Sequence, residues 1–369
     1  MIEKPLSKSI VYIPGGDTVR AFVSFCYDVM SPKKIISIEF GRVVAICAII
    51  AMHCQMFISY WQYDGTPWLG YVFNQATRFA VPLFFLISGY LIQPKLIVDP
   101  TTTLKQYLSP LLKIFLVWSA ICLAMPFNLG TVTEAGYLAE RQGYWGYLAQ
   151  TPLNTLFEGG LVHLWFIPAL MCAAAITALL SKLNKIDLLI PLAFTLYVYG
   201  VLAGSYQGLT EFWSPIFTRN GPFFSTLLFA IGFTIRQKNI QATARQALTL
   251  ALLGFAMHFA EALLLNQFEQ PFNANDFLFG TVLWGTGCFM WLLAKPTLGE
   301  NRWLTKQSKY VLPMYVAHLP MIIVMMNVSG ILQLSGFSKD MTVLFGAFVF
   351  TYLVVRLVEK TPLYRWLFR

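Results

Sequence analysis

Long apolar runs alternate with short polar connections along most of the chain. A helix needs about 20 mainly apolar residues to cross the hydrocarbon core of a membrane, so runs near this length predict membrane helices. Ten stretches fit the pattern: 39–60, 72–94, 105–126, 162–182, 187–204, 222–236, 246–265, 277–294, 309–327 and 341–358. The sequence therefore predicts an all-α, polytopic membrane helical bundle with about ten transmembrane helices.

The positive charges divide unevenly between the connections. Alternate connections carry most of the Lys and Arg residues, whereas the opposite ones hold only Arg141, Arg219 and Lys339. Connections rich in Lys and Arg stay on the cytoplasmic side of a membrane. An even number of helices then predicts that both termini are cytoplasmic.

The same pattern divides the chain into three parts. We expect a cytoplasmic N-terminal segment at 1–38, a transmembrane domain at 39–358 and a cytoplasmic tail at 359–369. Within the first segment, apolar residues between Val19 and Met30 recur at helical spacing. This spacing fits a short helix on the membrane surface, and a frayed tail fits equally well.

Composition excludes a soluble protein. Hydrophobic residues make up 57% of the chain and charged residues only 12%, and the mean hydropathy is +0.61. Ordinary soluble domains contain about twice that share of charged residues. The net charge of +9 does not indicate a nucleic-acid partner, because the basic residues cluster between apolar runs, where they set topology. Five of the six cysteines lie inside apolar runs at spacings typical of neither a zinc site nor a disulfide framework, so we expect no metal site.

The first apolar stretch contains two residues that are costly inside a membrane, Arg42 and His53. Their separation of eleven positions returns them to within about 20° of one helix face, roughly 16 Å apart along the axis. Glu39 lies one turn before Arg42 on the same stretch. An ionisable group within a membrane helix is a functional candidate by default. From the predicted topology, Arg42 lies near the cytoplasmic surface and His53 in the outer half of the bilayer.

The second apolar stretch has a similar arrangement. Arg78 precedes Pro82, and Ser88, Gly89 and Tyr90 follow. In a straight helix Gly89 would lie below Arg78 on one face, and a proline makes that phase approximate. Ser88 and Gly89 have an ordinary explanation as small residues in helix packing, but this leaves Arg78 unexplained.

The other polar residues of the apolar stretches give further candidates. His163 and Trp165 begin the fourth stretch, Arg219 and Asn220 precede the sixth, Tyr315 and His318 share a face of the ninth, and His258 and Glu261 are three apart on the seventh. For each histidine alone, a hydrogen-bonded structural role is the simpler explanation. Four histidines in or beside membrane helices favour a polar cavity. Their scatter without a group of carboxylates argues against a metal site.

Several of these residues together resemble acyltransferase family 3, the integral membrane O-acyltransferases. The resemblance rests on order and spacing: ten residues between Arg42 and His53, an arginine before PLFF-x-x-SGY, HLWF at 163–166, Asn-Gly at 220–221 and Tyr-x-x-His at 315–318. It covers the chain from about residue 35 to its end. The family usually has Asp and Gly where this chain has Glu39 and Val43.

The resemblance implies an O-acetyltransferase of a bacterial inner membrane. Its donor would be cytoplasmic acetyl-CoA or another acyl-CoA, with no permanently bound cofactor, and its acceptor a hydroxyl of a glycan or glycolipid. Arg42 would position the donor, and neutral His53 would act as general base. Arg78, or Arg219 with Asn220, would stabilise the oxyanion or bind the acceptor. An acyl-enzyme on Ser88 or His53 is the alternative to direct transfer.

A transporter or flippase for an amphipathic or sugar substrate is the alternative from another class. Arginines inside the membrane and proline-interrupted helices also occur along transport pathways. The sequence contains no persuasive internal repeat, which many transporters have. Transfer of a labelled acyl group to an acceptor would distinguish the two functions.

Overall fold

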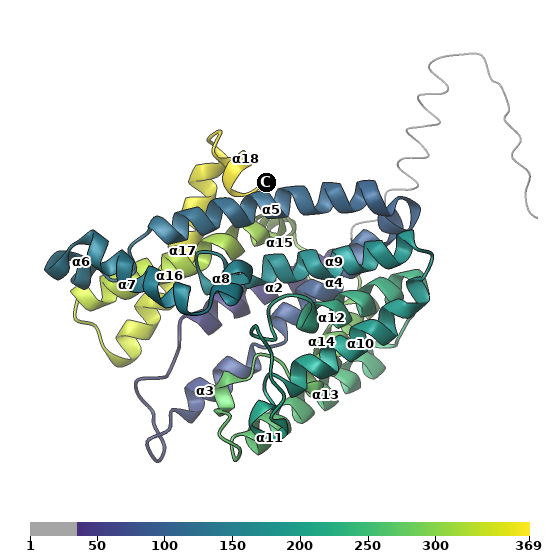
Figure 1. The fold of residues 1–369 in the computed structure, drawn as a ribbon, viewed down its shortest axis with the longest axis horizontal. Coiled ribbons are helices and arrows are strands. Elements are labelled where there is room, and N and C mark those ends of the chain that lie inside the picture. Colours follow the sequence, from purple (N-terminus) through teal and green to yellow (C-terminus); the bar gives the residue numbers. More distant parts are fainter. Residues whose placement is uncertain (1–34) are drawn as a thin grey trace, which may run out of the picture. The chain divides into compact units, whose positions relative to one another are not determined.

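The computed structural model describes residues 35–369, and this part is helical with one isolated two-residue bridge between Tyr63 and Thr66 (Figure 1). The helix expected around Val19 to Met30 lies outside the described residues. Each of the ten predicted stretches overlaps a helix. The main helices are α2 Ile36–His53, α3 Trp68–Ala76, α4 Ala80–Val98, α5 Pro100–Ala124, α9 Phe166–Lys182, α10 Leu189–Leu202, α12 Pro222–Gln237, α13 Ala244–Leu265, α14 Phe279–Ala294, α16 Val311–Ile331 and α17 Gly336–Glu359. The prediction of an all-α bundle is confirmed.

Seven segments of the described part are long and apolar enough to cross a membrane. Helices α10, α12 and α14 are shorter, at 14, 16 and 16 residues. The number of ten membrane crossings and the orientation of the termini therefore stay predictions. The connections carry smaller elements: α6 Leu129–Ala135, α7 Tyr137–Gln150, α8 Pro152–Glu158, η1 Val162–Trp165, η2 Ile186–Leu188, α11 Gln207–Thr210, η3 Phe272–Ala274, α15 Arg302–Gln307, η4 Ser308–Tyr310 and α18 Tyr364–Leu367.

The first helix ends earlier than its apolar pattern predicts. It ends at His53, and the next residues form turns in which Gln55 and Phe57 have φ of 50° and 62°. Positive φ is costly for residues other than glycine. The buried carboxylate of Asp340 on α17 holds the turn, because its Oδ2 accepts a hydrogen bond from the backbone N–H of Phe57 at 2.6 Å. A long-range contact therefore ends the helix, although the apolar sequence continues.

The second stretch is two helices rather than one. Helix α3 ends at Ala76, and the hydroxyl of Thr77 donates to the carbonyl of Asn74 at 2.6 Å. Helix α4 begins at Ala80, so Pro82 lies in its first turn, where a missing N–H costs no hydrogen bond. Arg78 lies in this break. The expectation of Arg78 and Gly89 on one continuous helix face is therefore wrong.

Helices α4 and α12 approach each other closely through a pair of glycines. A Cβ at Gly89 would lie 2.0 Å from the carbonyl oxygen of Phe229, and one at Gly232 would lie 2.0 Å from that of Leu86. Only glycine permits this backbone contact. Gly89 is thus a packing residue. The close contact fixes α4, which begins directly after the break at Arg78, against α12.

Candidate functional site

Three of the four histidines meet at one place. His53 ends α2, His163 lies in η1 and His318 lies on α16. The ring centroids of His53 and His318 are 5.0 Å apart, and those of His163 and His318 are 5.1 Å apart. Within residues 35–369 no group of three or more His, Cys, Asp or Glu side chains could hold a metal ion. The rings instead pack at steep angles to one another.

Backbone carbonyls assign the tautomers of these rings. His53 Nδ1 lies 2.9 Å from the carbonyl oxygen of Ile49, and His318 Nδ1 contacts that of Tyr315. A carbonyl only accepts, so each Nδ1 carries the proton and each Nε2 carries a lone pair. His318 Nε2 then faces the His53 Nδ1–H at 3.3 Å. His53 Nε2 has no hydrogen-bond partner within the described part of the chain.

His163 has the opposite tautomer, and a proline explains its partner. Its Nε2 donates to the carbonyl of Val316 at 3.0 Å. Pro320 lies four residues beyond Val316 on α16 and has no N–H, so this carbonyl lacks its usual helical donor. The hydroxyl of Tyr315 in turn donates to the carbonyl of His163. Residues 163 and 315 to 318 therefore form one hydrogen-bonded unit.

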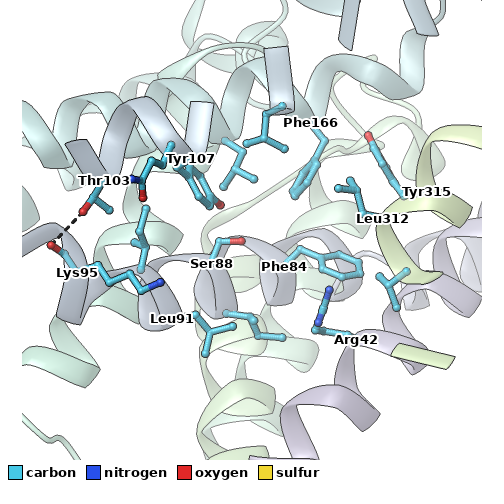
Figure 2. A pocket seen from close by; sticks show the side chains of 16 residues that line it. Arg42, Phe84, Ser88, Leu91, Lys95, Thr103, Tyr107, Phe166, Leu312 and Tyr315 are labelled. Carbon is cyan, nitrogen blue, oxygen red and sulfur yellow. Dashed lines mark hydrogen bonds between the residues drawn. The ribbon is translucent and has the colours of Figure 1, made fainter. Parts of the chain in front are cut away.

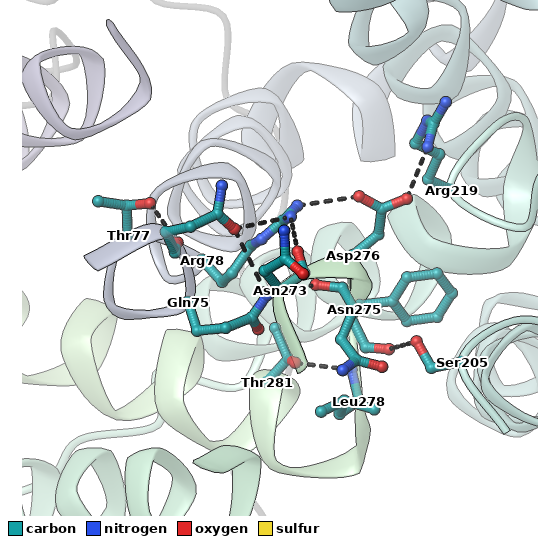
Figure 3. A network of polar contacts seen from close by, with 12 residues as sticks. Gln75, Thr77, Arg78, Ser205, Arg219, Asn273, Asn275, Asp276, Leu278 and Thr281 are labelled. Atoms are coloured by element: carbon teal, nitrogen blue, oxygen red, sulfur yellow. Dashed lines mark hydrogen bonds and ion pairs between the residues drawn. The ribbon is translucent and has the colours of Figure 1, made fainter. Parts of the chain in front are cut away.

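Beside the histidines lies an ion-pair network that joins the break between α3 and α4 to three connections (Figure 3). Arg78 Nη1 donates to Asp276 Oδ1 at 2.9 Å, and Arg219 Nη1 donates to Asp276 Oδ2 at 2.7 Å. Arg219 Nη2 also donates to Glu158 at 2.7 Å. Buried Asn220 donates to Asn154 and Glu158. Two guanidiniums thus share two carboxylates, and the network has no net charge.

The network controls the ionisation of its central carboxylate. Burial alone would raise the pKa of Asp276, but Arg219 and Arg78 outweigh burial and lower that pKa below its ordinary value. The Nε atoms of both arginines are buried and have no hydrogen-bond partner in the described residues. Each arginine therefore has one N–H group without an acceptor in residues 35–369.

Histidine and arginine residues line a common cavity of about 380 Å³. Its wall includes His53, His163, Arg78, Arg219 and Asp276, and we call it the His53 cavity. Trp165 contributes an aromatic face to the same space. The cavity therefore combines an unprotonated imidazole nitrogen with two guanidiniums and an aromatic surface.

Arg42 lies in a second cavity, of about 560 Å³, which we call the Arg42 cavity (Figure 2). Its polar residues include Ser88, Lys95 and Tyr107, and the remaining wall is mostly aliphatic and aromatic. Arg42 Nη1 donates to Glu39 at 3.2 Å. Although Arg42 and His53 share a helix, they therefore line different cavities, and among the described residues only Phe166 and Tyr315 line both.

Three further candidates from the sequence, Tyr90, His258 and Glu261, line neither the Arg42 cavity nor the His53 cavity. The hydroxyl of Tyr90 accepts from Arg236 Nη1 at 2.9 Å. His258 bonds Thr281 and Gln75, each at 2.8 Å. Glu261 accepts from Tyr206 and from the backbone N–H groups of Phe279 and Gly280. His258 and Glu261 are therefore held by different partners rather than by each other, and neither lines the Arg42 cavity or the His53 cavity.

Sequence reasoning missed the acidic half of the network. Asp276 directly precedes an apolar stretch, and Glu158 lies in a long connection, so neither lies on an apolar helix face. The available signal was the pair of outer arginines, because buried guanidiniums require carboxylates nearby. The lining residues Lys95, Tyr107 and Phe166 were also missed.

Comparison with known proteins gives one family and several partial relatives. The sequence model of a protein family described as an acyltransferase domain matches residues 35–360. The chain is 27% identical over 253 residues to a serine/alanine racemase of Enterococcus gallinarum, covering 64% of this chain and 34% of that protein. It is 26% identical over 276 residues to an amino-acid racemase of Enterococcus faecalis, covering 69% and 35%. The chain thus spans about a third of the length of these curated relatives. No solved structure matches significantly.

Proposed function

The chain belongs to acyltransferase family 3, and we propose that it moves an acyl group, acetyl as the first candidate, from cytoplasmic acyl-CoA to a hydroxyl of an extracytoplasmic or lipid-linked glycan. One observation carries the proposal: His53 has a lone pair on Nε2 and lines a cavity with two arginines, while Arg42 lines a second cavity. The apolar helices indicate an integral membrane protein, and a bacterial plasma membrane fits the source of the relatives.

The Arg42 cavity suits the donor. Arg42 and Lys95 supply positive charge, and no acidic residue is part of the wall formed by the described residues. Guanidinium and ammonium groups bind phosphate oxygens through charge-assisted hydrogen bonds. The apolar wall would accept the pantetheine arm. The distribution of Lys and Arg along the chain supports a cytoplasmic mouth for this cavity.

The His53 cavity suits the acceptor and the reaction. His53 Nε2 would take the proton of the acceptor hydroxyl as its oxygen attacks the thioester carbonyl carbon. The guanidiniums of Arg78 and Arg219, which line the same cavity, would stabilise the oxyanion. As the carbonyl reforms, the C–S bond breaks, and the imidazolium returns the proton to the leaving thiolate. The products are the ester and free CoA, and His53 is neutral again.

The racemase names of the relatives describe those proteins. Because the match covers about a third of their length, racemisation is not proposed for this chain. The alternative function is transport, and the break between α3 and α4 at Arg78 favours it, since discontinuous helices are typical of transporter binding sites.

A transfer assay tests the proposal. Purified protein is incubated with radiolabelled acetyl-CoA and a glycan and lipid extract, and label is measured in the acceptor fraction. We expect transfer by the wild type and a loss of about 100-fold or more in His53→Ala. The control is His258→Gln, a buried histidine outside both cavities, which should keep activity. Absence of label with every acyl-CoA, together with substrate movement in vesicles, would identify a transporter instead.

The same assay separates direct transfer from an acyl-enzyme. Ser88 lines the Arg42 cavity and His53 the other, so either could carry a transient acyl group. Direct transfer predicts no label on the protein when the acceptor is omitted, either after acid quenching, which preserves an acyl-serine, or under native conditions, which an acyl-histidine requires. Label trapped on the wild type and lost in Ser88→Ala would instead establish an acyl-enzyme on Ser88.

A further inference from the structure

Two aromatic side chains separate the cavities. Phe166, the first residue of α9, and Tyr315 on α16 are the only described residues that line both the Arg42 cavity and the His53 cavity. Their ring centroids lie 5.3 Å apart at an interplanar angle of 64°. Figure 2 shows both rings next to Leu312, on the side of the Arg42 cavity away from Lys95. A donor held by Arg42 therefore meets this aromatic pair before it reaches His53.

The two rings are held differently. The hydroxyl of Tyr315 donates to the carbonyl of His163, and its own carbonyl accepts from His318 Nδ1. Tyr315 is thus fixed to the histidine unit at both ends. The side chain of Phe166 has no polar atom, and its ring packs against those of Phe85, Phe84 and Trp165, with centroids 4.7, 6.1 and 6.4 Å away. Moving the Phe166 side chain breaks no hydrogen bond, whereas moving Tyr315 leaves a buried carbonyl without its donor.

We propose that Phe166 and Tyr315 form a gate between the two cavities, with Phe166 as the moving side and Tyr315 as the fixed side, and that the gate admits only short acyl groups to His53. The inference rests on the proposed acyl transfer. It names Phe166 as a residue that determines donor specificity.

The reason for the selection is steric. The thioester must pass between the rings for its carbonyl carbon to approach an acceptor beside His53, and the acyl group passes ahead of it. An acetyl group adds one methyl beyond the carbonyl, whereas a hexanoyl group adds a chain that must share about 380 Å³ with the acceptor. Rotation of one phenyl ring opens a narrow passage, and close-packed interiors give little additional space. Longer donors should therefore bind in the Arg42 cavity and react slowly.

A donor series tests the selection. Acetyl-, butyryl- and hexanoyl-CoA are compared by kcat/KM in the wild type, in Phe166→Ala and in Phe166→Leu, which keeps much of the apolar volume. We expect the ratio of hexanoyl to acetyl transfer to rise about tenfold in Phe166→Ala and less in Phe166→Leu. Phe233→Ala removes another buried ring, which lies outside both cavities, and its ratio should equal that of the wild type.

A labelling experiment tests the gate without any acyl transfer. Leu319 lines the His53 cavity but not the Arg42 cavity. In sealed vesicles of both orientations, an impermeant thiol reagent should label Leu319→Cys from one face only, after subtraction of the parent. The double variant with Phe166→Ala should be labelled from both faces.

The outcomes separate this inference from the proposed function. If the wild type transfers acetyl but the hexanoyl ratio in both Phe166 variants stays at the wild-type value, the gate is refuted and the proposed function stands. Labelling of Leu319→Cys from both faces with Phe166 intact also refutes the gate. If the wild type transfers no acyl group from any donor, the proposed function fails and the acyl selection fails with it.

Discussion

The two cavities differ in how their charges are balanced. Around His53, Arg78 and Arg219 share Asp276, and Glu158 neutralises the remaining charge. Around Arg42, the wall carries two cations: Arg42 is paired with Glu39, whereas Lys95 forms no ion pair with any residue from 35 to 369. The first cavity is electrically complete without a ligand, and the second has excess positive charge.

The difference indicates a division of labour. A cavity whose charges are already compensated and whose histidines are fixed by backbone carbonyls is preorganised for a neutral ligand such as a hydroxyl. A cavity with an uncompensated positive charge favours an anion, and in the proposed reaction the phosphates of CoA would supply one. Variants in the His53 cavity should therefore change kcat, whereas variants in the Arg42 cavity should change the KM for the donor.

The largest expected effect of this comparison is at Arg78. In Arg78→Gln the oxyanion loses a charged donor while Asp276 keeps Arg219 as its partner. We expect kcat to fall about 100-fold, as for removal of one oxyanion-hole donor, with a donor KM within about threefold of the wild type. Steady-state kinetics with labelled acetyl-CoA measure both. Arg236→Gln, an arginine bound to Tyr90 outside both cavities, is the matched control. A rise in the donor KM at constant kcat would show that the donor binds in the His53 cavity, and it would contradict the proposed assignment.

The next effect is at Arg42. Hydrogen bonds to charged groups contribute about 1.5–3 kcal/mol, so Arg42→Gln should raise the donor KM by roughly 10-fold or more. The value of kcat at saturating donor should change little, because Arg42 does not line the His53 cavity. Inhibition by free CoA should weaken in parallel. Lys113→Gln changes a cation outside this cavity and controls for general charge loss. An unchanged KM with a lower kcat would reverse the assignment of the two cavities.

The apolar pattern was sufficient to predict the helices but not their ends. A membrane helix satisfies its own backbone hydrogen bonds, so its presence can be predicted locally. The end of α2 at His53 depends instead on Asp340. Its carboxylate accepts a hydrogen bond from the backbone N–H of Phe57, 283 positions away in the sequence. The residues after His53 remain apolar, and hydropathy alone extends the helix to Tyr60.

The site was predictable in its parts and not in its arrangement. Helical spacing placed Arg42 and His53 on one face, but the two residues line different cavities, and Phe166 and Tyr315 from two other helices line both of these cavities. Asp276 was missed because an acid beside an apolar run resembles an ordinary solvent-exposed residue. Pairing between distant connections requires the tertiary structure, and spacing within one helix does not contain it.

A smaller effect is expected at Glu39, which is buried and accepts from Arg42 at 3.2 Å. If Glu39 orients Arg42 toward the donor, Glu39→Gln keeps the shape of the side chain but weakens the hydrogen bond. We expect the donor KM to rise about threefold, in line with a loss of about 0.5–1 kcal/mol from one hydrogen bond. Titration with acyl-CoA measures the change. A lower KM would instead show that Glu39 competes with the donor for Arg42.

The smallest effect concerns acid stability and applies to the His53 cavity alone. The pKa of Asp276 is lowered in the folded protein, so its ion pairs contribute stability at pH above the unfolded pKa of about 3.9. This contribution is lost as pH falls through the lower, folded pKa. Thermal unfolding in detergent should therefore show a smaller loss of Tm between pH 6 and pH 3 for Asp276→Asn than for the wild type. The control is Asp187→Asn, which removes an exposed carboxylate in η2 and should show the same loss of Tm between pH 6 and pH 3 as the wild type. An equal loss of Tm between pH 6 and pH 3 for Asp276→Asn and the wild type would mean that the Asp276 carboxylate is not ion-paired in solution. The His53 cavity would then lack the charge compensation that distinguishes it from the Arg42 cavity.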